Sequence, residues 1–394
     1  MRVVKNVYMD NAATTPVKKE VLDEMLPYFT EKYGNPSSIY RLGREGKAAI
    51  DDSRNKVANA IGANPKEIYF TSGGSEADNW AIKGVAFANK KKGNHIITSK
   101  VEHHGILHTC EYLERNGFDV TYLDVDENGI VDLKELEEAI TDKTILISIM
   151  FANNEIGTIQ PVKEIGEIAK KNGVYFHTDG VQAVGKIEID VDDLNIDMLS
   201  MSAHKIYGPK GIGALYIRKG VKIHPHIHGG AQEKNRRAGT ENVPSIVGFA
   251  KAIEMACENI DEHNKKLIKL RDKLIKDIAN NISHVKLNGH PEKRLSNNVN
   301  FSFEFIEGEA LLLSLDMVGV AGSSGSACTS GSLDPSHVLL SIGLPHEIAH
   351  GSLRLSLGDF NTEEEVDYVV ENLITIVDRL RKMSPLYENV KEDK

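Results

Sequence analysis

The order of apolar and amphipathic segments predicts an α/β fold with a largely parallel sheet. Short apolar runs of strand length alternate with helical patterns over the first two thirds of the chain. Such alternation is typical of strands that are covered by helices and joined by crossover connections. The chain has 394 residues, more than one hydrophobic core usually holds, so we expect about two domains.

The expected elements follow from local patterns in chain order. A strand-like entry (3–9) and a turn precede Pro16, which opens a helical pattern as proline does in a first helical turn. A charged helix is expected over about 46–61. The expected strands are 67–71, 95–99, 120–125, 144–151, 174–179, 196–202 and 214–218. Helices are expected to begin near 76, 104, 133 and 162.

The sequence pattern in the last third of the chain predicts a smaller α/β unit. A long helical pattern covers about 245–280, and a helix of this length often bridges two domains. We therefore place a domain boundary near residue 260. Cys257 lies on this helix among apolar residues and is most simply a small core residue.

Composition and charge exclude several classes of partner. The net charge of −10 is spread along the chain, and no basic face marks a nucleic-acid partner. The first residues, MRVVKNVYMDNAATTP, lack the apolar core of a signal peptide, and no apolar run approaches the roughly 20 residues of a membrane span. Three cysteines, odd in number and far apart, indicate a reducing compartment. We expect a cytoplasmic protein with no membrane contact.

Polar residues that follow the expected strands are the candidate site residues, because ligands of parallel sheets bind beyond the carboxyl ends of strands. Lys205 stands out, since it follows an apolar run and precedes a glycine-rich turn. A lysine in this position could form a Schiff base with a carbonyl compound, although a surface lysine in a polar turn is the simpler alternative. The candidates after strands are His103, His104, Asn153, Asn154, Asp179, Gln182, Ser202, His204 and Lys205.

The turn Ser72-Gly73-Gly74-Ser75 is a candidate anion site. It joins a strand to a helix, and the N–H groups at a helix start favour negative charge. An ordinary capped helix is the alternative. The turn matches neither a P-loop nor a dinucleotide fingerprint.

Two further candidates lie in the last third. Cys328 stands in a Gly- and Ser-rich segment, about 322–334, whose composition is typical of a flexible, exposed loop, and a lone cysteine there is a candidate nucleophile. Arg354 lies in a strand-like alternation, where an inward arginine needs a carboxylate partner from the protein or from a substrate.

Two metal-like patterns have unfavourable contexts, so no metal site is predicted. Residues 124–135 fit a calcium-loop spacing, but a strand precedes them where that motif needs a helix. His224, His226 and His228 alternate at strand spacing, yet Pro225 and the following glycines indicate an irregular segment.

These segments together resemble the pyridoxal-phosphate cysteine desulfurases of iron–sulfur cluster assembly, in the class-V aminotransferase family. The resemblance runs nearly end to end. The motifs that carry it include YMDNAATTP, YGNPSS, TSGGSEADN, EHH, NNEIG, HTDGVQAVGK, SAHKIYGPKGIGALY, RRAGT, SSGSACTSGSLDPSHVL and AHGSLRLSLG. The cysteine loop resembles that of group I, in which the loop is long and mobile.

The resemblance implies fold type I, with a seven-stranded, mainly parallel sheet in a large domain (16–260). The small domain would combine 1–15 with 261–394 and carry the cysteine loop. Lys205 would bond covalently to the cofactor, and Cys328 and His103 would complete the catalytic set. The implied cofactor contacts are Gly74, Ser75, His103, Asn154, Asp179, Gln182, Ser202, His204 and Lys205, with Thr240 from the neighbouring subunit of a homodimer.

The resemblance also implies the reaction. Arg354, Asn154 and Asn35 would bind the substrate L-cysteine, and sulfur would pass through a persulfide on Cys328 to an iron–sulfur scaffold protein or another acceptor, with alanine as the product. Cys328 could also ligate an iron–sulfur cluster during transfer. A selenocysteine lyase or another class-V enzyme is the alternative. Tyr40, Asn235-Arg236, Gly74 and Gly180 depart from what relatives often carry.

Overall fold

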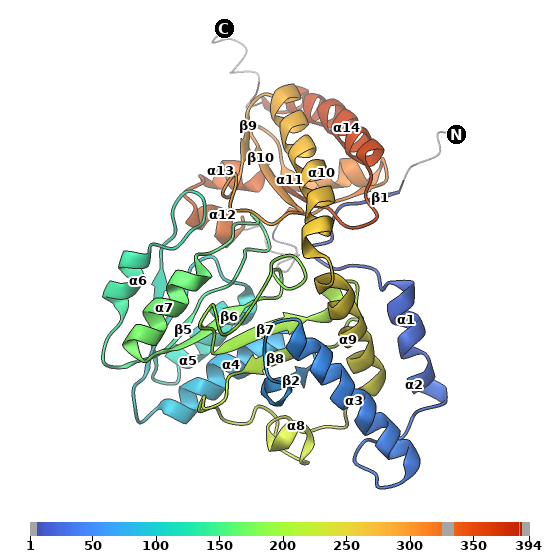
Figure 1. Ribbon diagram of the computed structural model, residues 1–394. Helices are drawn as coiled ribbons and strands as arrows, with labels where there is room; N and C mark the ends of the chain where they lie inside the picture. The colour runs from blue at the N-terminus through green and yellow to red at the C-terminus, as the bar shows by residue number, and fades with distance from the viewer. Residues whose placement is uncertain (1–5, 325–334, 386, 388–394) are drawn as a thin grey trace.

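The computed structural model describes residues 6–324, 335–385 and 387. A seven-stranded sheet forms its centre (Figure 1). Its strands are β2 (Ile68–Thr71), β3 (His95–Ser99), β4 (Asp119–Leu123), β5 (Thr144–Ser148), β6 (Tyr175–Asp179), β7 (Met198–Ser202) and β8 (Gly213–Ile217). They pair in the order β2-β8-β7-β6-β5-β3-β4, and only β8 runs antiparallel to its neighbours. The predicted α/β class with a mainly parallel sheet is confirmed.

Helices cover both faces of this sheet. Because side chains alternate along a strand, the buried residues divide between two apolar clusters. One contains Trp80 of α4 (Gly74–Asn89) and Ile106 of α5 (His104–Glu114), together with Met198. The other joins Leu199 to the buried faces of the remaining helices around the sheet. These are α3 (Arg41–Asn59), α6 (Leu133–Ala139), α7 (Val162–Asn172) and α9 (Val243–Cys257).

A second, antiparallel sheet has its own apolar cluster. It consists of β9 (Val285–Leu287), β10 (Asn298–Phe303) and β12 (Ser352–Ser356), in the order β12-β10-β9. The buried residues between this sheet and its helices form one cluster. The helices are α10 (Ile260–Asn281), α11 (Gly308–Asp316) and α14 (Glu363–Lys382).

The start of the chain packs with this second sheet. Strand β1 (Val7–Tyr8) pairs with β11 (Val320–Ala321), and Met9 is buried in the same cluster (Figure 1). Residues 10–13 then run to the carboxyl ends of β6 and β7 in the large sheet. This connection brings the two sheets to one cavity.

Some predicted boundaries were wrong. The pattern over 245–280 is two helices, because Asn259 adopts a non-helical backbone (φ −147°, ψ 56°) between α9 and α10. The charged helix begins at Arg41, five residues earlier than expected, and α4 begins at Gly74 and not at Glu76. The pattern after Pro16 is two short helices, α1 (Lys19–Met25) and α2 (Pro27–Thr30). The remaining short helices are η1 (Pro65–Glu67), η2 (Ala203–Lys205), α8 (Gln232–Asn235), α12 (His337–Ser341) and α13 (His346–His350).

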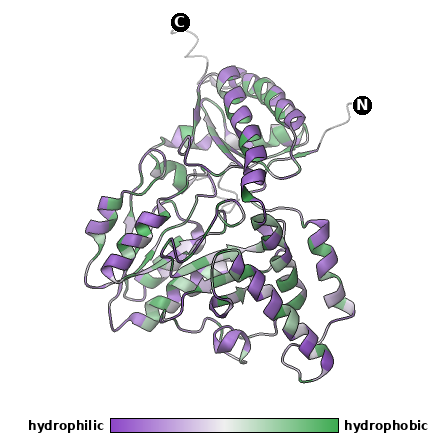
Figure 2. Ribbon diagram, viewed as in Figure 1, coloured by the Kyte–Doolittle hydropathy of each residue, from purple (hydrophilic) through white to green (hydrophobic). Residues whose placement is uncertain are grey.

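Hydropathy along the helices matches this layering. Helices around both sheets carry hydrophilic and hydrophobic residues on the same element, as expected for one buried and one solvent-facing side (Figure 2). Within the described ranges, no helix is long and apolar enough to cross a bilayer.

Candidate active site

A cavity of about 320 Å³ lies beside the carboxyl ends of β6 and β7. Both sheets and the N-terminal segment contribute to its wall. Most of the residues predicted for the site line it. These are Gly74, Ser75, His103, Asn154, Asp179, Gln182, Ser202, His204, Lys205 and Arg354. Asp78, Val181, Ala12 and Ala13 line it as well.

Lys205 follows β7 directly, in the 3₁₀ turn η2. Its amine donates hydrogen bonds to the carbonyl oxygens of Ala12 and Ala13, at 2.5 and 2.6 Å. These two carbonyl oxygens hold the amine in place. The side chain therefore presents a nitrogen at the cavity wall, where a carbonyl ligand could reach it.

The start of α4, where the sequence predicted an anion site, lies at the cavity. Gly74 and Ser75 form the first turn of this 16-residue helix and line the cavity. A Cβ atom at Gly74 would lie 2.6 Å from Val181 Cγ2, so a larger residue here would require the Val181 side chain to shift. Ser72 does not contribute, because its N–H and hydroxyl both donate to the Glu76 carboxylate.

His103 caps the N-terminus of α5. Its Nδ1 accepts a hydrogen bond from the N–H of Gly105 at 3.0 Å, so a neutral ring carries its proton on Nε2. Burial, aided by the nearby positive charge of Lys205, lowers the pKa of His103 to about 4. At neutral pH, His103 is thus an uncharged donor at the cavity.

Asp179 ends β6 and is buried. One of its oxygens, Oδ1, accepts from the N–H of Val181 at 2.9 Å. Burial raises the pKa of Asp179 to about 6, while this hydrogen bond and the charge of Lys205 act in the opposite direction. A cationic ligand beside this carboxyl would favour its ionised form.

Arg354 enters the cavity from β12 and is only 2% exposed. Its Nη2 pairs with Asp10 Oδ1 at 2.8 Å, and Nη1 donates to the carbonyl oxygen of Asn154 at 3.0 Å. The sequence required a carboxylate partner for this arginine, and Asp10 is that partner within the protein. Asp10 was missed as a site residue, although it stands in the motif YMDNAATTP.

Two further predicted residues contact the N-terminal segment. Gln182 Nε2 donates to the carbonyl oxygen of Ala12 at 3.0 Å. His204 Nδ1 lies 3.2 Å from Thr14 Oγ1, and burial together with Lys205 lowers the pKa of this histidine to about 4. The segment 12–14 therefore joins several site residues.

Three residues that the resemblance assigns to the site are not placed at this cavity, and the candidates His104 and Asn153 do not line it either. Asn35 is exposed, and its Oδ1 accepts from the N–H of Ser37 at 2.9 Å. Thr240 is also exposed, and the resemblance assigns its contact to a neighbouring subunit. Cys328 lies outside the described residues.

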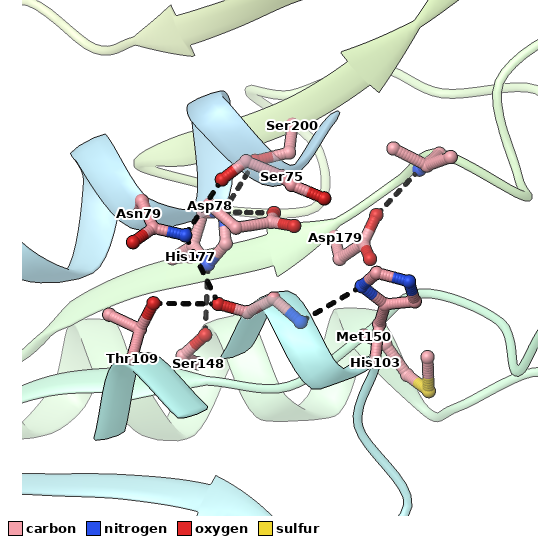
Figure 3. A network of polar contacts seen from close by, with 12 residues as sticks. Ser75, Asp78, Asn79, His103, Thr109, Ser148, Met150, His177, Asp179 and Ser200 are labelled. Atoms are coloured by element: carbon pink, nitrogen blue, oxygen red, sulfur yellow. Dashed lines mark hydrogen bonds and ion pairs between the residues drawn. The ribbon is translucent and has the colours of Figure 1, made fainter. Parts of the chain in front are cut away.

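A buried polar network beside the cavity was not predicted (Figure 3). It contains Asp78 of α4, His177 and Ser200 in the middle of β6 and β7, and Ser148 at the end of β5. Polar residues inside strands carry no such signal in the sequence, because ligands of a parallel sheet bind beyond the ends of its strands. The period of a strand could have found His177, which stands two residues before Asp179 and so shares its face. Within the described residues, no cluster of three or more His, Cys, Asp or Glu side chains is arranged to hold a metal ion.

Comparison with known proteins agrees with this geometry. The class-V aminotransferase family model matches residues 7–369. The chain is 64% identical over 392 residues to a cysteine desulfurase IscS of Clostridium botulinum, with 99% of both chains covered. It is 65% identical over 382 residues to that of Methanosarcina thermophila, with 97% of this chain and 94% of the relative covered.

Solved structures give the same result. A NifS-like protein superposes with a TM-score of 0.90 at 43% identity, covering 95% of this chain and all of the other. SspA in complex with cysteine gives a TM-score of 0.80 at 40% identity, covering 91% of this chain and all of the other. The chain belongs to the class-V aminotransferase family. Within that family it is a cysteine desulfurase, and it depends on pyridoxal phosphate.

The cavity residues fit this cofactor. The first turn of α4, with Ser75, suits a phosphate group, and Lys205 suits an aldehyde. Asp179 is a buried carboxyl on the same cavity, and its ionised form suits a protonated ring nitrogen.

Proposed function

We propose that this cysteine desulfurase takes sulfur from free L-cysteine, releases L-alanine and carries the sulfur as a persulfide on Cys328. The observation that carries the proposal is the single cavity that gathers Lys205, Asp179, His103 and Arg354. The overall exchange balances, because the carbon–sulfur bond of cysteine is replaced by a carbon–hydrogen bond and the Cys328 thiol becomes a persulfide with a terminal S–H.

Each cavity residue has its own role in the reaction of cysteine. When bound, the cofactor withdraws electrons from the substrate carbons. The Lys205 amine is the base placed to take the proton from Cα of cysteine, and neutral His103 is placed to hold or return a proton at Nε2. Arg354 and Asn154 bind the substrate carboxylate, so that the amine of cysteine faces Lys205. Asp179 holds the negative charge opposite a cationic ring nitrogen.

The other two cysteines are poor nucleophiles, which supports Cys328. Cys110 is fully buried, and burial raises the pKa of its thiol well above the ordinary value. Burial also raises the pKa of Cys257 to about 11. Both are therefore protonated thiols at neutral pH, whereas sulfur attack requires a thiolate.

The localisation, oligomeric state, sulfur acceptor and domain boundaries are proposed from the family resemblance. We propose a cytoplasmic homodimer in which Thr240 of one subunit reaches the cofactor phosphate of the other. An iron–sulfur scaffold protein, or another sulfur acceptor, would take the persulfide, and Cys328 would ligate a cluster during that transfer. The two sheets would belong to separate domains, 16–260 and 1–15 with 261–394.

The experiment replaces the nucleophile and leaves the cofactor site intact. Cys328→Ala should keep the visible absorbance of the bound cofactor and lose both alanine and sulfide production from cysteine. Cys257→Ala is the matched control and should keep all three. Alanine and sulfide production by Cys328→Ala at the wild-type rate would refute the role of Cys328.

A further inference from the structure

A chain of buried polar side chains crosses the large sheet behind the cofactor cavity (Figure 3). Ser148, His177 and Ser200 stand on the neighbouring strands β5, β6 and β7, and all three are fully buried. His177 Nδ1 lies 2.9 Å from Ser148 Oγ, and His177 Nε2 lies 2.9 Å from Ser200 Oγ. Ser200 in turn is hydrogen-bonded to the carboxyl of Asp78.

Asp78 connects this chain to the cavity. It projects from α4, is 1% exposed and lines the same cavity as Asp179. Its Oδ1 has no hydrogen-bond partner in the part of the chain that the structure describes and lies 3.8 Å from His177 Nε2. A buried carboxyl in this position needs an explanation, because an ionised carboxylate with an unsatisfied oxygen is costly to bury.

The hydrogen-bond chain has two possible proton arrangements. If Asp78 is ionised, Ser200 donates to it, and His177 donates from Nε2 to Ser200. If Asp78 is a neutral acid, it donates to Ser200, Ser200 donates to His177 Nε2, and His177 donates from Nδ1 to Ser148. The Nδ1–H tautomer of His177 is therefore the one expected when Asp78 is a neutral acid that donates to Ser200.

The surrounding charges favour the neutral acid. Burial, then the carboxyls of Asp179 and Glu102, raise the pKa of Asp78 well above its ordinary value, against a smaller effect of Ser200. His177 cannot compensate with a positive charge, since burial lowers its pKa to about 3. Lys205, a cation of this cavity wall, favours the ionised form of Asp179 and is not among the charges that shift the pKa of Asp78.

Glu102 and His103, the other titratable groups near the pair, do not supply a cation. Burial raises the pKa of Glu102 to about 8, and His103 is neutral as described above. Two adjacent carboxyls in one buried site favour a single negative charge between them. Of Asp78 and Asp179, the carboxyl that lies nearer to a cation is the one that carries this negative charge.

We propose that Asp78 is a positioning residue that stays a neutral acid, donates its proton to Ser200 and so leaves the single negative charge of the pair on Asp179, where the cofactor ring binds. The proposal rests on the cofactor site described above. Its test does not use sulfur transfer, so its failure would leave the desulfurase proposal standing.

Infrared spectroscopy of the cofactor-loaded enzyme tests the charge directly. In protein labelled with ¹³C at the aspartate carboxyl, the C=O stretch of a buried carboxylic acid is separate from the carboxylate bands. At neutral pH the wild type should show an acid band that Asp78→Asn lacks. If that variant loses only carboxylate intensity, Asp78 is ionised and the proposal is wrong.

Two further readouts cover the case in which the asparagine variant folds poorly. Ser200→Ala should keep the acid band and move it to higher frequency, because the acid loses its acceptor; loss of the band would contradict the proposal. In wild-type protein with ¹⁵N-labelled histidine, His177 should show the Nδ1–H tautomer, with its signal identified by its absence in His177→Gln. An Nε2–H tautomer would overturn the proposal.

Discussion

Lys205 of the large sheet and Arg354 of the small sheet are held at the cavity in different ways. Lys205 stands in a turn just past a parallel strand, and its amine contacts the carbonyl oxygens of Ala12 and Ala13. Arg354 stands inside an antiparallel strand, where it pairs with Asp10. A lysine amine can exchange carbonyl partners during a reaction, whereas a buried ion pair fixes its arginine. The large sheet thus supplies the reactive group, and the small sheet supplies a rigid one.

Removal of the reactive group should have the largest effect. Lys205→Ala deletes both the covalent link to the cofactor and the base for Cα, so the rate of alanine formation should fall by about a thousand-fold or more. Stopped-flow spectroscopy with cysteine would measure it. Lys210→Ala, a nearby lysine outside this cavity, is the control and should retain activity. A fall of less than about ten-fold for Lys205→Ala would contradict the assigned role.

Change of the rigid group should have a smaller effect and a different signature. Arg354→Lys keeps the charge but loses the two-nitrogen contact to Asp10 and Asn154, so kcat/KM for cysteine should fall by about a hundred-fold. The fall should appear mainly in KM, with the visible absorbance of the cofactor unchanged. An unchanged KM would show that Arg354 does not bind the substrate carboxylate.

The ion pair of Arg354 also makes a prediction for stability. Asp10→Asn leaves a buried guanidinium without its carboxylate, and such a loss typically costs about 3–5 kcal/mol. Chemical denaturation would measure the free energy of unfolding. A change within about 0.5 kcal/mol would mean that solvent or another group neutralises Arg354.

The large sheet should show its own pH dependence. The pKa of His177 is about 3 in the folded protein, below its ordinary value of 6.5, so the unfolded chain binds more protons between these values. His177 therefore contributes stability at neutral pH that is lost as the pH falls below 6.5. The loss amounts to roughly 1.4 kcal/mol per pH unit.

Comparison with a variant isolates this contribution, because the raised pKa of Asp179 acts with the opposite sign between pH 3.8 and 6. In His177→Gln, the slope of the unfolding free energy of the cofactor-free protein against pH should be more negative than in the wild type, by roughly 1.4 kcal/mol per pH unit over that range. Equal slopes for the two proteins would show that His177 is protonated in the folded state.

The sequence predicted the parts of the site that depend on local order. Asp179 and Lys205 follow strands, and the start of α4 follows a glycine turn, so their place at the carboxyl edge of a parallel sheet could be inferred from the pattern. The strands and most of their boundaries followed from the same alternation, whereas their number in one sheet was implied by the family resemblance.

The remainder depends on contacts between distant segments. The pairing of Asp10 with Arg354 joins residues 344 positions apart, and local periodicity carries no information on it. The network of Asp78 and His177 is buried between a helix and three strands, where sequence patterns lead one to expect apolar residues. The break at Asn259 was hidden because its flanking helices continue one amphipathic pattern.

The location of the transferred sulfur shows whether Cys328 carries it. The cofactor-loaded enzyme would be mixed with a small excess of L-cysteine without reductant, digested after alkylation and analysed by mass spectrometry. We predict one added sulfur atom on the peptide that contains Cys328, and about one alanine released per added sulfur. Sulfur on Cys110 or Cys257, or alanine without bound sulfur, would contradict the account.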